Sequence, residues 1–283
     1  MIDSLDGRPI GRRLLQLLPV AILLMVFFIA PLVVMFRYSL DRFTADGMTV
    51  SDLTPANYQR FVTDTYFSGI LATTLTLGLA VTVMSVVLSY PLAYAIARVR
   101  PPVRTALIII VLVPLMTGVV ARSYGWTVLL GGSGVINKAL SSIGLPTASL
   151  MFSVPGTVIA LVEVLMPFMV LSLLASLQHI DRTVEDAARS LGAPPWRVFA
   201  DIVLPLSLPG LAAGSLLVFV QAISAFATPA LIGGVSTRVM STLVFTQATT
   251  IFNWPFAAAA SFILLAIVAT LTAIQGRLLR GHR

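Results

Sequence analysis

Side chains that could do chemistry are few in this chain, and one of them stands out by its surroundings. Glu163 is the single charged residue in the stretch from Ala139 to Gln178. A charge is costly where such a stretch crosses a membrane, so it marks a functional site by default. The two histidines, His179 and His282, lie far apart in sequence, and the chain has no cysteine. The residue types therefore exclude thiol chemistry and give no metal-ligand spacing.

A glycine-rich run from Gly131 to Gly134 raises the question of a phosphate loop. No Gly-Lys-Ser/Thr follows the run and no strand precedes it, so we interpret it as a flexible turn. An intramembrane enzyme is also disfavoured, because it would need a Ser-His or paired-acid set within the apolar stretches. Only Glu163 lies there, while His179 lies at the edge of one.

The composition indicates an all-α polytopic membrane protein. Of the 283 residues, 58% are hydrophobic and only 10% are charged, whereas an ordinary soluble domain has about 25% charged residues. These values exclude a soluble enzyme, a disordered chain and a disulfide scaffold. The net charge of +7 indicates basic cytoplasmic loops rather than nucleic-acid binding.

Long stretches without charge predict six transmembrane helices, since a spanning helix needs about 20 apolar residues. The expected spans are about 14–37, 66–93, 105–124, 153–177, 207–229 and 255–277. We expect 14–277 to form the transmembrane domain, with tails at 1–13 and 278–283. A cleaved signal peptide with five spans is the alternative for 14–37, but this run exceeds a signal-peptide core and no A-x-A-like site follows it.

The basic residues predict the orientation of these spans. With the N-terminus inside, 12 of the 18 Lys and Arg residues lie in inner segments. Because cytoplasmic loops are enriched in these residues, both termini are expected in the cytoplasm. An even number of spans agrees with this orientation.

The longest polar segment on the inner side, 178–206, is predicted to form a helix-turn-helix. Thr183 suits a helix N-cap, and Gly192 suits a left-handed helix end. Pro195 suits the start of a second helix, which we expect Pro205 to stop. Apolar residues recur at helical spacing on this second helix at Trp196, Phe199 and Ile202. An apolar surface of this kind needs a partner.

This segment resembles the EAA loop of the permease subunits of bacterial ABC importers, the MetI-like family. The family pattern is Glu-Ala-Ala, three residues, Gly, nine residues and Ile-x-Leu-Pro, and the only departure is an aspartate in place of the glutamate. Glu185, beside that aspartate, can share its role. The residues that the resemblance assigns to ATPase coupling are Glu185, Asp186, Ala187, Ala188, Gly192, Ile202, Leu204 and Pro205.

The resemblance implies the MetI-like permease fold and a set of partners. The chain would work with a dimer of ABC ATPases, a second permease subunit and an external solute-binding protein. It would bind no cofactor itself, and ATP and Mg would bind to the partner ATPase. The expected location is the bacterial inner membrane, and a secondary transporter working alone is the less favoured alternative.

Other segments look like the PotB-type spermidine/putrescine permeases. They include Asn57-Tyr58, 90–95, 120–126, 134–137, Pro167-Phe168, 226–234 and 253–255. This similarity implies polyamine import and a PotC-like second permease. An opine, an amino-acid derivative or another small solute remains the alternative substrate.

Glu163 is the natural starting point for a substrate path. A carboxylate near a cavity suits a cationic amine, and Tyr124, Trp126 and Phe168 could add cation–π contacts. The competing interpretation is a glutamate paired with an arginine or hydrogen-bonded to a neighbouring helix. Arg122, at the outer end of the third span, is expected either to anchor that span at the interface or to gate the outer mouth.

Overall fold

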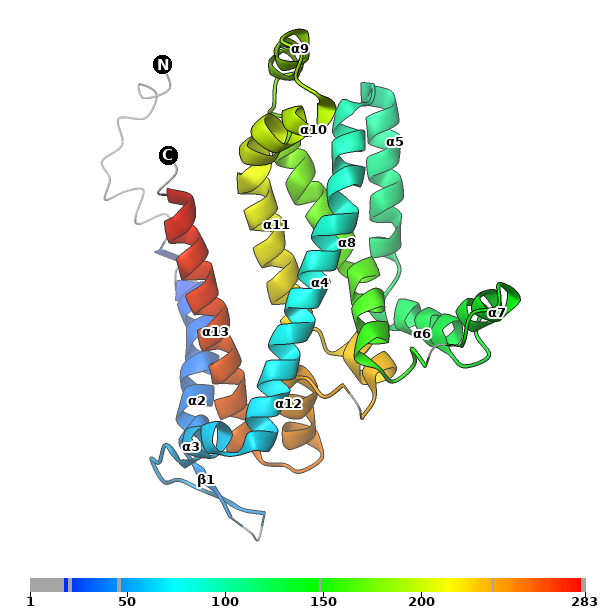
Figure 1. Ribbon diagram of the computed structural model, residues 1–283. Helices are drawn as coiled ribbons and strands as arrows, with labels where there is room; N and C mark the ends of the chain where they lie inside the picture. The colour runs from blue at the N-terminus through cyan, green and yellow to red at the C-terminus, as the bar shows by residue number, and fades with distance from the viewer. Residues whose placement is uncertain (1–17, 20–21, 45–46, 148, 236, 281–283) are drawn as a thin grey trace, which may run out of the picture. The chain divides into compact units, whose positions relative to one another are not determined.

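The computed structural model describes residues 18–19, 22–44, 47–147, 149–235 and 237–280, which are mostly helical (Figure 1). The chain divides into two units, one of residues 1–63 with 244–263 and one of residues 64–243 with 264–283. The predicted tail 1–13, the start of the predicted span 14–37 and the end of the tail 278–283 lie outside the described residues.

The smaller unit consists of a helix, a short hairpin and a second helix, together with part of the C-terminal region. Its elements are η1 (Met25–Ile29), α2 (Ala30–Ser39), β1 (Arg42–Phe43), β2 (Thr49–Val50) and α3 (Ala56–Thr63). The strands β1 and β2 are antiparallel, with Arg42 opposite Val50. The side-chain amide of Asn57 donates to the backbone carbonyl oxygens of Ser39, at 2.9 Å, and Asp41, at 2.8 Å. These hydrogen bonds hold α3 to the end of α2.

In the described part of the chain after residue 239, two further helices follow, α12 (Met240–Thr249) and α13 (Trp254–Arg280). Within the smaller unit, α13 packs through aromatic rings. Phe262 meets Phe36 of α2 edge to face at 5.3 Å between ring centroids, and Phe256 lies 6.3 Å from Phe61 of α3. Aromatic pairs of this geometry stabilise helix contacts beyond the area that they bury.

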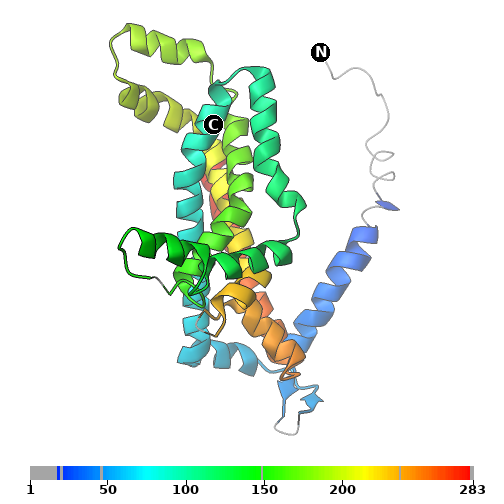
Figure 2. The ribbon, with the colours of Figure 1, turned by 90° about the vertical axis from the view of Figure 1, so that its right-hand side faces the viewer.

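The larger unit is built on three long helices that pack along one another, α4 (Thr65–Arg98), α8 (Val154–Leu177) and α11 (Leu204–Ser224) (Figures 1 and 2). Asp64 caps α4 by accepting the N–H of Tyr66 at 2.9 Å. The three helices share a buried apolar core, which includes Leu77, Val81, Met169, Leu173, Val218 and Ala222. In unbroken apolar helices, this packing rather than hydrophobic periodicity determines which face lies inside.

Glycines on α11 let it approach α8 closely. A β-carbon on Gly210 would lie 2.7 Å from the backbone oxygen of Ser172, and one on Gly214 would lie 2.8 Å from the sulfur of Met169. The Ser172 hydroxyl also donates to the carbonyl of Gly210 at 2.9 Å. Small residues at helix crossings serve this close approach in membrane proteins.

The third predicted span, 105–124, is not one straight helix. The structure has α5 (Pro101–Leu112), then the 3₁₀ helix η2 (Val113–Met116), and then α6 (Val119–Leu130), with a bend of 90° between Met116 and Val119 (Figure 2). Pro114 lacks the N–H that an α-helix needs at this point, and Thr117 has an extended backbone. The chain therefore turns sideways at Thr117-Gly118, and α7 (Val135–Ser142) follows α6.

The fifth predicted span, 207–229, ends earlier than expected. The helix α11 stops at Ser224, and residues 229–233 form the separate element η4 (Pro229–Gly233). A small second core joins α6, α8 and η4 through Leu130, Ala160 and Ile232. The backbone of Phe152 supports it, with its N–H donating to the Ile232 carbonyl at 2.8 Å.

Five helices of the described residues are long and apolar enough to cross a membrane, and the bent pair Pro101–Met116 and Val119–Ser142 would make a sixth span. The five are Ile22–Ser39, Thr65–Arg98, Val154–Leu177, Pro195–Ser224 and Trp254–Arg277. The number agrees with the six spans that the sequence predicts, and the bent pair takes the place of the third.

Candidate functional site

The first helix of the predicted helix-turn-helix is α9 (Arg182–Ser190), and its N-cap differs from the expectation. Asp181, not Thr183, is the cap: its carboxylate accepts the backbone N–H of Thr183 at 3.0 Å. The helix therefore begins directly after Asp181, and Thr183 lies inside its first turn, where its free backbone N–H is bound by the Asp181 side chain. This backbone hydrogen bond, with the Thr183 side chain, holds the pKa of the Asp181 carboxyl below its ordinary value.

The turn after α9 has the backbone that the sequence predicts at Gly192. Its φ is +84°, in the left-handed region. The N–H of Gly192 donates to the carbonyl of Arg189 at 2.9 Å, and that of Ala193 donates to the carbonyl of Ala188 at 3.1 Å. These two bonds form a Schellman motif, which takes up free carbonyls at the helix end.

The second helix begins as predicted but does not stop at Pro205. Helix α10 (Pro195–Val198) leads into the π-helix η3 (Phe199–Val203) and directly into α11, so Pro205 lies in the first turn of α11. A single π-helical turn of this kind interrupts the regular helical hydrogen bonds locally without ending the helix. Because the helix continues, Ile202, Leu204 and Pro205 join the polar loop rigidly to a core helix of the larger unit.

Helices α9 and α10 form one end of the larger unit (Figure 1), and this end presents apolar side chains. Leu191 is 89% exposed and Trp196 is 64% exposed. Ala187 is exposed and Ala188 half-buried, so the neighbouring helix surface is small. Of the three residues predicted from the sequence to form an apolar surface in need of a partner, Trp196 and Phe199 are exposed and Ile202 is half-buried.

Glu185 and Asp186 are adjacent in sequence but face different surroundings. The Asp186 side chain is 69% exposed and accepts from Arg189 at 3.2 Å. The Glu185 side chain is only 3% exposed and pairs with Arg98 at the end of α4. Asp186 is therefore available to an external partner, and Glu185 is bound within the chain.

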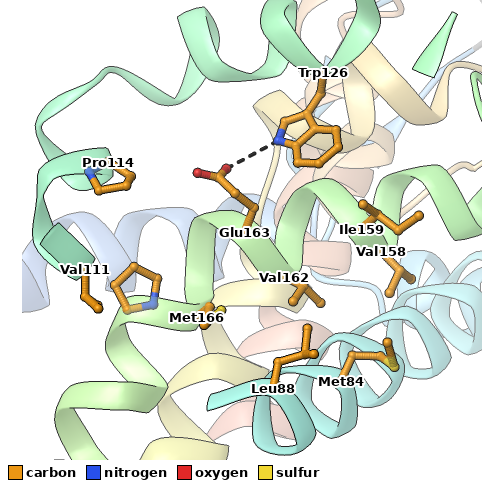
Figure 3. A pocket seen from close by; sticks show the side chains of 11 residues that line it. Met84, Leu88, Val111, Pro114, Trp126, Val158, Ile159, Val162, Glu163 and Met166 are labelled. Carbon is orange, nitrogen blue, oxygen red and sulfur yellow. Dashed lines mark hydrogen bonds between the residues drawn. The ribbon is translucent and has the colours of Figure 1, made fainter. Parts of the chain in front are cut away.

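The second candidate region surrounds Glu163, near the middle of α8. Its Oε1 lies 3.4 Å from the Nη1 of Arg122, and the indole N–H of Trp126 donates to its Oε2 at 3.4 Å. Both partners come from α6, which lies beside α8 because of the bend before it. Figure 3 shows the Glu163 carboxylate and the Trp126 indole pointing toward one another.

Glu163 and Trp126 line a cavity of about 430 Å³ (Figure 3). The other walls are apolar and come from α4, α5, η2 and α8, with Met84, Leu88, Val111, Pro114, Val158, Ile159, Val162, Met166 and Pro167. The Glu163 side chain is 32% exposed, whereas that of Arg122 is 10% exposed. The charge that the cavity presents is therefore the carboxylate.

A comparison with protein families identifies the chain. Residues 90–282, more than half of its length, match the family described as "Binding-protein-dependent transport system inner membrane component". This chain belongs to that family. It is a multi-pass permease of an ABC importer in the inner membrane, as the EAA-like segment predicted, and permeases of this family work with an ATPase and a periplasmic binding protein.

Named relatives agree with this assignment. The permease is 33% identical over 223 residues to the spermidine/putrescine transport system permease protein PotB of Escherichia coli K12, covering 78% of this chain and 81% of the relative. It is 31% identical over 256 residues to the inner membrane ABC transporter permease protein YdcU of the same organism, covering 85% and 80%.

The fold of the permease is that of a solved importer. A chain of the bacterial alginate ABC transporter, crystallised with an alginate-bound periplasmic protein, matches it with a TM-score of 0.77 at 20% identity, over 95% of this chain and 94% of that one. The predicted all-α permease fold is thus confirmed.

The permease brings together only part of the predicted substrate-path set. Glu163, Trp126 and Arg122 form one cluster, whereas Tyr124 is 58% exposed and does not line the cavity. Phe168 is half-buried and packs against the helix core.

Sequence reasoning missed the apolar walls of the cavity, such as Met84 and Leu88 of α4. Nothing distinguishes them in sequence from lipid-facing residues. The described part of the permease contains no group of three or more His, Cys, Asp or Glu residues that could hold a metal ion.

Proposed function

We propose that this permease imports a small organic cation, a polyamine such as spermidine or putrescine. The observation that supports the proposal most is the cavity beside α8, where an otherwise apolar wall presents one carboxylate, that of Glu163. The name of the relative PotB points the same way.

A polyamine has alkyl segments between ammonium groups, and the cavity offers a complement to each part. The apolar side chains of α4 and α8 suit the methylene segments. An ammonium would bind at Glu163, and the indole face of Trp126 adds a cation–π contact. Arg122 keeps the carboxylate fixed from the side away from the cavity.

An opine or another amino-acid derivative is the alternative, since a zwitterion would use both members of the Arg122–Glu163 pair. The exposures of the two side chains favour the cation. Arg122 is 10% exposed and does not line the cavity, so a substrate carboxylate would find no accessible guanidinium.

The remaining assembly follows the family. A dimer of ABC ATPases would dock on the exposed face of residues 178–206, around Leu191 and Trp196, and would bind the ATP and Mg that this permease does not. The second permease would be PotC-like. Both termini would lie in the cytoplasm, where the positive-inside rule places the basic ends of the chain.

The test uses the complete transporter with its binding protein in proteoliposomes, measuring uptake of radiolabelled spermidine. Glu163→Gln should reduce uptake at low substrate concentration about 10- to 150-fold, because a charge-assisted hydrogen bond contributes about 1.5–3 kcal/mol. A double variant, Glu163→Gln with Arg122→Gln, removes both charges, so that no unpaired arginine is left at the site.

Asp52→Asn is the matched control, since it removes one carboxylate from an exposed pair with Arg42 at 3.6 Å. The control should import spermidine like the unaltered protein. Unchanged uptake in both Glu163 variants would refute the carboxylate's role. Failure of the unaltered transporter to import spermidine, with uptake of an amino-acid derivative instead, would overturn the polyamine assignment.

A further inference from the structure

The contacts of Glu185 link α9 to one particular transmembrane helix. Its Oε1 pairs with the Nη2 of Arg98, and its Oε2 accepts the hydroxyl of Tyr94 at 3.0 Å. Both partners lie in the last two turns of α4. The Nη2 of Arg189, on α9 itself, lies 3.4 Å from the same Oε2. Both oxygens of a nearly inaccessible carboxylate are thus engaged, in the way that a buried charge requires.

A second arginine strengthens the same junction from α9. The Nη2 of Arg182 donates to the carbonyl oxygen of Arg98 at 2.5 Å and to that of Ala97 at 3.4 Å. These carbonyls belong to the C-terminal end of α4, where the helix dipole attracts a cation. One turn of α9 therefore supplies a carboxylate to an α4 side chain and a guanidinium to the α4 backbone.

The neighbouring turns of α4 hold the rest of the segment 178–206. The ring of Phe199 in η3 meets Tyr90 edge to face at 5.2 Å and Tyr94 at 6.5 Å. The hydroxyls of Tyr90 and Ser207 lie 2.6 Å apart, which links α4 to α11. The final turns of α4 are thus joined to α9, to η3 and to α11.

Helix α4 extends from this junction, through Pro91 inside the helix, to the cavity, where Met84 and Leu88 form part of the wall. Because the residues on both sides of Pro91 belong to one helix, a displacement of the Arg98 end reaches the Met84 and Leu88 end. By contrast, residues 178–181, between α8 and α9, include no helical residue. Ile180 of this connection is buried in the core, so α9 is attached to the larger unit both through its chain connection to α8 and through its polar contacts with α4.

We propose that Glu185 is a positioning residue that latches α9 to α4 through Arg98, so that α9 and α4 move as one body during transport. The proposal rests on the function proposed above for 178–206 as the ATPase-docking segment. ATPase motion applied to α9 then reaches Met84 and Leu88 through α4. Asp186, which is exposed, remains free for the partner.

The first test is the ratio of spermidine imported to ATP hydrolysed in the reconstituted transporter. Glu185→Gln should lower this ratio at least five-fold while the ATPase still co-purifies, because a loose α9 still docks but no longer moves α4. Asp52→Asn, which removes a carboxylate from an exposed pair, should leave the ratio unchanged. Since Glu185→Gln leaves Arg98 unpaired, a double variant with Arg98→Met provides a folded comparison without an unpaired charge, and it should show the same loss.

A chemical rescue separates the latch from a general role in stability. The chain has no cysteine, so Arg98→Cys with Glu185→Cys places two unique thiols, given cysteine-free partner subunits. A short reducible bis-thiosulfonate linker between them should restore at least half of the normal ratio, and reduction should abolish it again. A linked pair that remains as poorly coupled as the unlinked one would overturn the proposal, as would normal coupling in Glu185→Gln.

A second measurement needs neither ATPase nor substrate. Spin labels at Ser190→Cys on α9 and Val87→Cys on α4 should give one narrow distance distribution in the otherwise unaltered permease. Adding Glu185→Gln should broaden it at least two-fold, and equal widths would overturn the latch. A transporter that imports no spermidine but shows this broadening would refute the proposed function and leave the latch standing.

Discussion

Replacing Gly210 by alanine tests the close approach of α8 and α11 more directly than any change of a large side chain. The new β-carbon would lie 2.7 Å from the Ser172 backbone oxygen and 2.3 Å from the Ser176 hydroxyl. A serine hydroxyl can rotate away, but a backbone oxygen cannot, so the helices must separate. We therefore expect Gly210→Ala to destabilise the permease.

The magnitude follows from three contributions. Overpacking costs about 1–3 kcal/mol, and weakening the Ser172 hydrogen bond to the Gly210 carbonyl costs about 1 kcal/mol. The higher helix propensity of alanine stabilises the helix by about 1 kcal/mol. The net loss is about 1–3 kcal/mol.

Gly69→Ala is the matched control, because Gly69 lies in α4 and a β-carbon added there would have no atom within 4 Å. The same substitution should stabilise the permease there by about 1 kcal/mol through helix propensity alone. The two variants thus differ by about 2–4 kcal/mol, and one kcal/mol shifts the melting temperature by about 2–4 °C in proteins of 150–250 residues.

Thermal unfolding of both purified variants in one detergent, followed by intrinsic fluorescence, provides the measurement. We expect the Gly210→Ala melting temperature to lie below that of the unaltered permease and the Gly69→Ala one above it. Shifts of the same sign and size in both variants would refute the packing argument, since helix propensity alone would then explain them.

Two further predictions concern the ends of α9. Gly192→Ala should lower the free energy of unfolding of the permease by about 1–2 kcal/mol, because a φ of +84° is unfavourable for a residue with a β-carbon. The variant should also co-purify less well with the ATPase. An unchanged melting temperature would contradict this prediction. Asp181 has a lowered pKa in the folded state. The stabilisation that its ionised carboxylate gives as a helix cap is therefore fully present above the ordinary aspartate pKa of about 4, and it is lost as the pH falls through the lower pKa of the folded state. The melting temperatures of the unaltered permease and Asp181→Ala should therefore differ at pH 7 and converge at low pH, whereas a constant difference would show that the charge of Asp181 is unimportant.

The sequence predicted the number and places of the long helices well, because unbroken apolar runs leave few alternatives. It failed where a local breaker competes with such a run. Pro114 and Gly118 lie within the predicted third span, and together they bend it between η2 and α6. The opposite error occurred at Pro205, where a stop was expected but η3 lets the helix continue.

The candidate site shows a different limit. The carboxylate of Glu163 was visible in sequence because a charge in an apolar run is unusual. Its partner Arg122 lies 41 residues away and reaches it only because α6 turns sideways. Glu185 was grouped with Asp186 by adjacency, yet its partner Arg98 is 87 residues distant, and no sequence period connects them.

The length of α4 has a consequence for the history of insertions and deletions in this permease. Its 34 residues extend about 51 Å at 1.5 Å per residue, about 20 Å more than the hydrocarbon core of a bilayer. One inserted residue between Leu88 and Tyr94 would turn the Arg98 end by about 100° relative to the cavity wall. The spacing between these two points is therefore expected to be invariant among related permeases, whereas the exposed residues 143–147 after α7 are expected to tolerate insertions.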